Sequence, residues 1–295
     1  MNRWLRACAL LTTALATSTI PYVYGCAANG GAQSGDPLAF EASTTPQPEG
    51  TFKDGGAEAS AEIPDCEEGV KQIFVLGADK GLYRFYPDEL RFEHLGVVGC
   101  PTTAGTFSMG IDRKGIAWVE FMDGRLFAVN TRDGSCVPTA FQPGQAGFKN
   151  FGMGFAKRND GSNDETLFVS GDGLAALDTT TLQLKFLGSL TFGRTELTGL
   201  GSELYAFAVG SGVIAKLDPA TGATLAVHRS TAIGERAAFA FAQWGGDFWL
   251  FTGSTMSQVT KYSPATDTST VVVENAGTLI VGAGSSTCAP IKPVH

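Results

Sequence analysis

The chain has 295 residues, a formal net charge of −8 and 43% hydrophobic residues. Residues 26–65 carry a net charge of −6 and residues 66–295 carry −4, so most of the acidity lies near the N-terminus. A mildly acidic globular part argues against nucleic acid or an anionic membrane face as a partner. The same part is long enough to bury a large core as one domain.

Residues 1–25 are predicted to form an export signal. Arg3 and Arg6 make its start basic, and residues 7–20 form an apolar run that is too short to span a bilayer as a mature helix. We therefore expect the mature chain in an oxidising compartment, where cysteines pair.

The signal ends at Val23-Tyr24-Gly25-Cys26, which resembles the bacterial lipobox. This resemblance implies that Cys26 becomes the lipidated first residue of the mature protein, and Ala27 after it agrees with sorting to the outer membrane. No later segment has a long uncharged apolar run, so we expect membrane attachment through the lipid alone. The alternative is ordinary secretion, with Cys26 as a spare thiol.

Residues 26–65 differ in composition from the rest of the chain. Gly, Ala, Ser, Thr, Pro and Glu dominate this segment, and large apolar residues are almost absent. Such a segment cannot bury enough surface to offset its chain entropy. We expect a disordered acidic tether with a root-mean-square reach of about 35 Å.

A hydrophobic strand that runs into a turn rich in Asp, Pro and Gly recurs five times after residue 66. Successive copies start 44, 48, 40 and 45 residues apart, which is the period of four-stranded propeller blades. Each repeat divides into four strands, from strand A at the axis to strand D at the outside, and the recurring turn joins C to D. The copies start at Phe85, Val129, Leu177, Leu217 and Tyr262.

The predicted fold is all-β: a five-bladed β-propeller over residues 66–295. Its first repeat begins at a B strand, Ile73-Phe74-Val75-Leu76, and has no A strand before it. Leu279-Ile280-Val281-Gly282 has A-strand character and nothing after it to form another blade. We therefore expect the C-terminal strand to complete blade one and close the ring, which leaves no exposed sheet edge at that seam.

Four cysteines lie in the predicted propeller, and in an exported domain they suggest two disulfides with three possible pairings. Ring closure brings Cys288 towards Cys66, so we predict a bond between them. Cys100 and Cys136 would then pair by elimination. No C-x-x-C spacing is present, which makes a zinc site improbable.

The lipobox, the acidic tether and repeats such as Leu217-Asp218-Pro219-Ala220-Thr221-Gly222 resemble the lipid-anchored β-propeller proteins of bacteria. Phe107-Ser108-Met109-Gly110-Ile111-Asp112-Arg113 and Gly245-Gly246-Asp247-Phe248-Trp249-Leu250-Phe251 are similar to the multicopy, uncharacterised lipoproteins of gliding soil bacteria. The resemblance covers nearly the whole chain. It implies location and fold only, because no activity is established for that group.

Residues suited to catalysis are scarce. His94 and His228 fall in expected outer D strands, away from the axis, and His295 is the last residue. The sequence has no Gly-x-Ser-x-Gly elbow, no Walker loop and no His-Glu-x-x-His motif. We therefore predict no catalytic residue, no cofactor and no metal.

Carboxylate pairs define the alternative function. Five-bladed propellers include glycoside hydrolases, which need acids converging on the axis about 5–9 Å apart. The expected inner strands are almost uncharged, which disfavours this chemistry. The alternative prediction is a carbohydrate-active hydrolase, with Glu196, Glu235 and Asp79 as the acids to test first.

Two further features have structural explanations. Residues 159–165 are an oxygen-rich insertion in an A–B hairpin, but they lack the ligand spacing of a calcium loop, so we expect a solvated tip. Trp118, Trp244 and Trp249 lie on or beside B strands. We expect them to fill the core between blades rather than to stack on sugars.

The remaining candidate site is the propeller mouth, where D–A connections and B–C turns meet. Its mixed charge suits a polar small molecule, a peptide or a glycan, and an ordinary solvated rim is the alternative. We predict a monomeric, non-catalytic binding or scaffolding protein of the envelope with an unidentified small-molecule, glycan or protein partner. The mouth residues are Lys149, Asn150, Arg194, Glu196, Glu235, Arg236, Asp79, Asp123 and Asp172.

Overall fold

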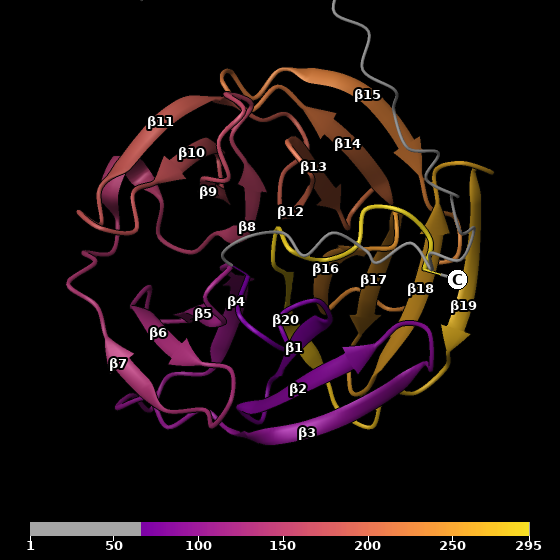
Figure 1. Cartoon of the computed structure of the whole chain (residues 1–295), viewed down its shortest axis with the longest axis horizontal. Coiled ribbons are helices and arrows are strands. Elements are labelled where there is room, and N and C mark those ends of the chain that lie inside the picture. The colour runs from indigo at the N-terminus through magenta and orange to yellow at the C-terminus, as the bar shows by residue number, and fades with distance from the viewer. Residues whose placement is uncertain (1–65, 295) are drawn as a thin grey trace, which may run out of the picture. The chain divides into compact units, whose positions relative to one another are not determined.

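The computed structural model describes residues 66–294. The predicted signal peptide, Cys26 and the tether lie outside these residues. Residues 66–294 form twenty strands in five antiparallel sheets, with one short 3-10 helix at Gln145–Gly147. The sheets stand around a central axis as five blades (Figure 1). The predicted five-bladed β-propeller is therefore confirmed.

Four blades follow chain order from the axis outwards. Blade two is β4 (Thr106–Ile111), β5 (Ile116–Phe121), β6 (Leu126–Asn130) and β7 (Cys136–Pro138). Blade three is β8 (Gly152–Lys157), β9 (Glu165–Ser170), β10 (Gly173–Leu177) and β11 (Leu184–Ser189). Blade four is β12 (Thr195–Leu200), β13 (Glu203–Ala208), β14 (Val213–Leu217) and β15 (Thr224–Arg229). Blade five is β16 (Ala238–Trp244), β17 (Asp247–Gly253), β18 (Ser257–Ser263) and β19 (Thr268–Val273).

Blade one is built from both ends of the described chain. Its order is β20 (Ile280–Ser285), β1 (Ile73–Gly77), β2 (Gly81–Tyr86) and β3 (Arg91–Val97). β20 pairs antiparallel with β1, so that Val75 lies opposite Ala283. The C-terminal strand thus supplies the missing inner strand, as predicted.

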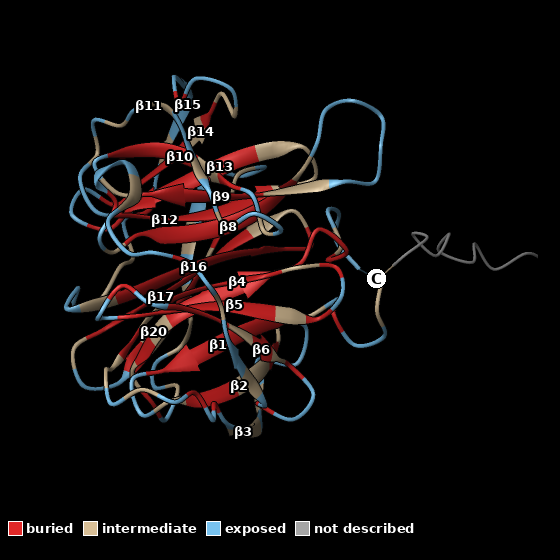
Figure 2. Cartoon of the chain, turned by 90° about the vertical axis from the view of Figure 1, so that its left-hand side faces the viewer, coloured by how far each residue is buried: buried red, intermediate tan, exposed pale blue. Residues whose placement is uncertain are grey.

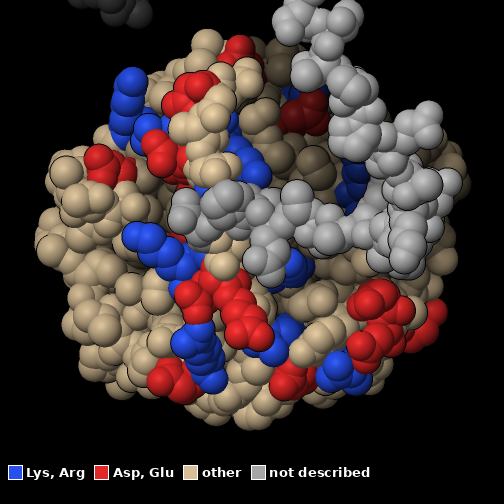
Figure 3. All heavy atoms as spheres, viewed as in Figure 1, with Lys and Arg blue, Asp and Glu red and all other residues tan. Residues whose placement is uncertain are grey.

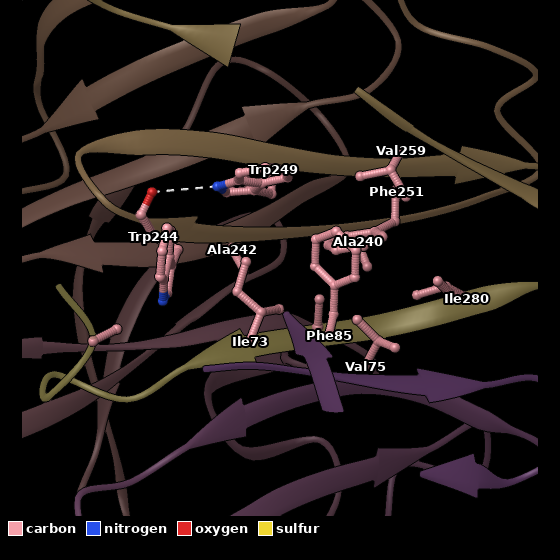
Figure 4. Close-up of a cluster of buried hydrophobic side chains, with 12 residues drawn as sticks. Ile73, Val75, Phe85, Ala240, Ala242, Trp244, Trp249, Phe251, Val259 and Ile280 are labelled. Atoms are coloured by element: carbon pink, nitrogen blue, oxygen red, sulfur yellow. Dashed lines mark hydrogen bonds between the residues drawn. The ribbon is translucent and has the colours of Figure 1, made fainter. Parts of the chain in front are cut away.

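A buried apolar cluster joins blade one to blade five at the closing seam (Figure 4). The Phe85 ring packs against two side chains of β17, with centroid distances of 5.4 Å to Trp249 and 5.7 Å to Phe251. Trp244 Nε1 also donates a hydrogen bond of 2.9 Å to the carbonyl of Lys71, just before β1. Burying a Phe side chain contributes about 1.5–3 kcal/mol to the free energy of folding, so Phe85 stabilises the packing of blade one against blade five.

Both predicted disulfides are confirmed. Cys66 and Cys288 join the segment before β1 to the segment after β20, with a Cα–Cα distance of 6.1 Å. Cys100 and Cys136 join the connection after β3 to β7, with a Cα–Cα distance of 4.9 Å. Disulfides persist in oxidising environments, so the folded part of the chain is suited to an exported location.

Burial decreases from the axis to the outside of the ring. The inner strand β8 is buried at every position except its last, whereas β15 is exposed at every position except His228 (Figure 2). Functional side chains held by the inner strands are therefore set in the most rigidly packed part of the fold. Within residues 66–294, no helix has the length and apolar character that a bilayer crossing requires.

Candidate functional site

A cavity of about 520 Å³ opens at one end of the propeller axis. All five inner strands contribute to its wall, through Phe107 of β4, Gly152 of β8, Glu196 of β12, Ala238 of β16 and Val281 of β20. We call it the axial cavity. Its volume falls in the range of roughly 300–1,000 Å³ that is typical of small-molecule sites.

Five of the nine predicted mouth residues lie together in the wall of the axial cavity. They are Lys149, Asn150, Asp172, Arg194 and Glu196. Lys149, Asp172 and Arg194 are exposed, Asn150 is half-buried and Glu196 is buried. The wall therefore combines three exposed charged side chains with one buried acid.

The other four predicted mouth residues, Asp79, Asp123, Glu235 and Arg236, are exposed but do not line the axial cavity. Each makes a local polar contact instead. The partners are Gly81 for Asp79, Arg125 for Asp123, Ser254 for Glu235 and Gly210 for Arg236. Of the three acids proposed for hydrolysis, only Glu196 reaches the axial cavity.

Glu196 links three blades through its carboxyl group. Its side chain belongs to blade four and is only 3% exposed. Oε2 accepts hydrogen bonds from the Ser108 hydroxyl of blade two, at 2.9 Å, and from the Met153 backbone N–H of blade three, at 3.3 Å. Burial raises the pKa of Glu196 well above its ordinary value, against the opposing effects of these hydrogen bonds and of Arg194. The neutral carboxyl is therefore favoured.

A second buried acid, Glu120 of β5, lies near Glu196. Glu120 is 0% exposed, and its Oε2 accepts a hydrogen bond of 2.9 Å from the Phe151 backbone N–H. Burial is the largest of the causes that together raise its pKa to about 9, and the nearby Glu196 and Asp123 make smaller contributions. Within the described chain, Glu120 Oε1 has no hydrogen-bond partner. Glu120 is thus a neutral acid at neutral pH.

The inner edge of blade three explains why both acids are present. β8 is an edge strand of its sheet, so the backbone N–H groups on the side away from β9 need acceptors from outside the sheet. Glu120 serves Phe151 and Glu196 serves Met153, two positions further along. Glu120 was not predicted from the sequence, because the expected acids lay on inner strands, in D–A connections or in B–C turns, and none lay within a B strand. The available signal was one glutamate inside the apolar strand Ile116–Phe121.

Gly152 allows the close approach that delivers Glu196 to this edge. A Cβ at Gly152 would overlap the carbonyl oxygen of Thr195 and lie 2.8 Å from the Glu196 Cα. A larger residue at Gly152 would push blades three and four apart. The small residues of the inner strands therefore position the site as well as relieve crowding at the axis.

Phe107 occupies a β-bulge at the start of blade two. Thr106 lies opposite Phe121 and Ser108 lies opposite Glu120, so Phe107 is an extra residue without a partner on β5. It is half-buried and lines the axial cavity. Bulges near binding sites commonly redirect a side chain, and here the bulge gives the cavity an aromatic wall.

The far end of the axis carries a separate polar cluster. Glu165 accepts hydrogen bonds from the Arg113 backbone N–H, at 2.9 Å, and from the Thr287 hydroxyl, at 2.8 Å. Burial raises the pKa of Glu165 to about 7. Of the predicted solvated tip at residues 159–165, residues 159–164 are exposed, whereas Glu165 is half-buried and ties blade three to the C-terminal segment. On the face shown in Figure 3, acidic and basic side chains lie interspersed.

Two of the histidines and the three tryptophans singled out in the sequence lie away from the axial cavity, in outer strands or in the core. His94 lies on β3 and His228 on β15, both outermost strands. Trp118, Trp244 and Trp249 are buried in the apolar clusters between blades. Across residues 66–294, no group of three or more His, Cys, Asp or Glu side chains is placed to hold a metal ion.

The fold and the axial cavity define a five-bladed β-propeller with a small-molecule-sized site on its axis. No family model matches the chain, and no curated protein sequence matches it. The chain is similar to one in a nidogen/laminin complex, with a TM-score of 0.47 and 9% identity over 72% of this chain and 97% of that chain. It is also similar to a protein of unknown function from Bacteroides caccae, with a TM-score of 0.43 and 13% identity over 73% and 83%. A third similar structure is the extracellular domain of a hybrid two component system from B. thetaiotaomicron, with a TM-score of 0.38 and 11% identity over 70% and 29%.

Proposed function

We propose that the chain is a non-catalytic binding protein of the bacterial cell envelope and that its ligand enters the axial cavity. The observation that carries this proposal is the cavity itself, which all five inner strands line and which exposes charged side chains at its wall. Small-molecule sites are concave and combine apolar surface with polar groups that fix the orientation of the ligand.

The protonation of the buried acids favours binding over glycoside hydrolysis. A hydrolase of this kind needs one carboxylic acid and one ionised carboxylate flanking the scissile bond. Glu120 and Glu196 both have raised pKa values, so burial favours the neutral form of each. Glu120 and Glu196 can each donate a proton, but neither supplies the ionised carboxylate that such a hydrolase needs beside the acid.

We further propose that a lipid on Cys26 holds the protein at the outer membrane, with residues 26–65 as a tether. The two disulfides support an exported location, because they suit an oxidising compartment. Two acyl chains are enough for stable anchoring.

Replacing Ala237 by tryptophan is expected to abolish ligand binding. Ala237 is exposed and lines the axial cavity, so an indole there fills space that a ligand would occupy. Ligand-observed NMR against a panel of polysaccharides, peptidoglycan fragments, peptides and small metabolites measures this. Ala226→Trp is the matched control, because Ala226 is exposed on the outer strand β15.

The panel also distinguishes the alternatives. Equal binding by wild type and by Ala237→Trp would place the site outside the axial cavity and overturn the proposal. Cleavage of a polysaccharide that Glu196→Gln abolishes would replace the binding function by the hydrolase.

Replacing Cys26 by serine is expected to release the protein from the membrane fraction and to prevent its labelling by an alkyne fatty acid. Without its acyl chains the protein loses the apolar burial that anchors it. Cys8→Ser, within the predicted signal, is the control and should still be labelled. Retention of Cys26→Ser in the membrane fraction would contradict lipid anchoring.

A further inference from the structure

The wall of the axial cavity has an uncompensated positive charge. It contains two cations, Lys149 and Arg194, and two acids, Asp172 and Glu196. Burial favours the neutral form of Glu196, so Asp172 is the acid that opposes the two cations. The net charge of the wall is therefore about +1, although the protein as a whole is acidic.

Both cations are available to a ligand. Among residues 66–294, neither Lys149 nor Arg194 takes part in an ion pair. The Arg194 guanidinium lies over the Phe239 ring, 5.1 Å from its centroid, and Phe239 is itself buried in the cavity wall. This stacking restrains the guanidinium at the entrance of the cavity and leaves its donors to bind a planar anion.

Aromatic and aliphatic side chains contribute apolar surface to the wall of the axial cavity, alongside glycines and polar residues such as Asn150 and Ser170. Phe107 is directed into the wall by its bulge, and Val281 contributes an aliphatic group from β20. Both are half-buried, so both retain surface that a ligand can cover. Apolar surface in the same cavity as the two exposed cations fits a molecule with an apolar body and one anionic end.

We propose that the axial cavity binds small organic carboxylates with an apolar body, with Arg194 holding the carboxylate and Phe107 and Val281 contacting the body. This inference rests on the proposed binding function and names its ligand class. A planar carboxylate can accept two parallel hydrogen bonds from a guanidinium, which an ammonium group cannot supply.

Two matched pairs of probes test the proposal on the full exported protein. N-acetyl-L-phenylalanine and its amide differ in the charge of one group, and glucuronic acid and glucose form a pair without an apolar body. We expect the carboxylate of the first pair to bind at least about tenfold more tightly than its amide, which is the scale of one charge-assisted hydrogen bond. We expect glucuronic acid to bind more weakly than N-acetyl-L-phenylalanine.

Substitutions assign the preference to the cavity. Arg194→Gln is expected to reduce the preference for the carboxylate by about tenfold. Arg236→Gln removes the same charge from an exposed arginine outside the cavity wall and should leave the preference unchanged. Phe107→Ala should weaken the binding of N-acetyl-L-phenylalanine and of its amide alike.

Three results would overturn the inference. They are equal binding of a carboxylate and its neutral partner, an equal effect of Arg194→Gln and Arg236→Gln, and no binding of any of the four probes. A fourth result, tighter binding of glucuronic acid than of N-acetyl-L-phenylalanine, would overturn the inference that the ligand has an apolar body. None of these four results would overturn the proposed binding function. That function is tested separately, by whether Ala237→Trp abolishes binding of a ligand from the NMR panel.

Discussion

Replacing Cys66 and Cys288 by serine is expected to destabilise the propeller by about 5 kcal/mol, because the bond closes a loop of 222 residues. The loss comes mainly from the greater freedom of the unfolded chain, and it grows with the logarithm of loop length. Urea unfolding under non-reducing conditions measures it. The same variant should show faster amide exchange in β1 and β20, since these strands lose the bond that fixes their ends.

Replacing Cys100 and Cys136 by serine provides the comparison. This bond spans 36 residues, so its removal is expected to cost about 4 kcal/mol. Exchange in β1 and β20 should then stay close to that of the wild type. Equal exchange of β20 in both variants would show that ring closure does not depend on the Cys66–Cys288 bond.

Replacing Glu120 by glutamine is expected to flatten the dependence of stability on pH. The pKa of Glu120 is raised from 4.5 to about 9 in the folded protein, so the folded state binds more protons than the unfolded state between these values. Its contribution is fully present below pH 4.5 and is lost as the pH rises through about 9. The full loss is about 6 kcal/mol, or about 1.4 kcal/mol per pH unit.

Glutamine mimics the neutral acid and keeps an acceptor for the Phe151 N–H. The free energy of unfolding of wild type minus that of Glu120→Gln should therefore fall steadily between pH 5 and pH 9 in urea unfolding experiments. Glu235→Gln, at an exposed carboxyl, is the control and should leave the wild-type slope unchanged. Parallel profiles for wild type and Glu120→Gln would contradict the burial of an acid at this position.

The blade architecture was accessible from the sequence because every blade repeats the same local chemistry. Apolar B strands and Asp- or Pro-containing turns recur at a regular period, and each defines a strand and its reversal without long-range information. The absence of an A strand before Ile73, with an orphan strand near Val281, then predicted ring closure. That step also identified the partner of Cys66.

The site was less predictable, because its residues meet only through the packing of blades. Lys149, Arg194 and Glu196 follow from the topology, which brings D–A connections to one end of the axis. Glu120 does not, since it projects from a second strand towards the neighbouring blade. The redirection of Phe107 depends on a one-residue bulge, which leaves no distinctive pattern in the sequence.

The protonation states of Glu120 and Glu196 also arise from tertiary structure. Both are ordinary glutamates in the sequence, and their raised pKa values come from burial between blades. Their hydrogen bonds to blade three give them a structural role that does not require an ionised carboxylate.

A crystal structure of the exported protein with a molecule from the NMR panel tests the assignment of the binding site most directly. We predict that the molecule lies in the axial cavity, in contact with Phe107 and beside the Arg194 guanidinium. A molecule bound elsewhere on the protein, with the axial cavity empty at a concentration that saturates binding in solution, would contradict this assignment.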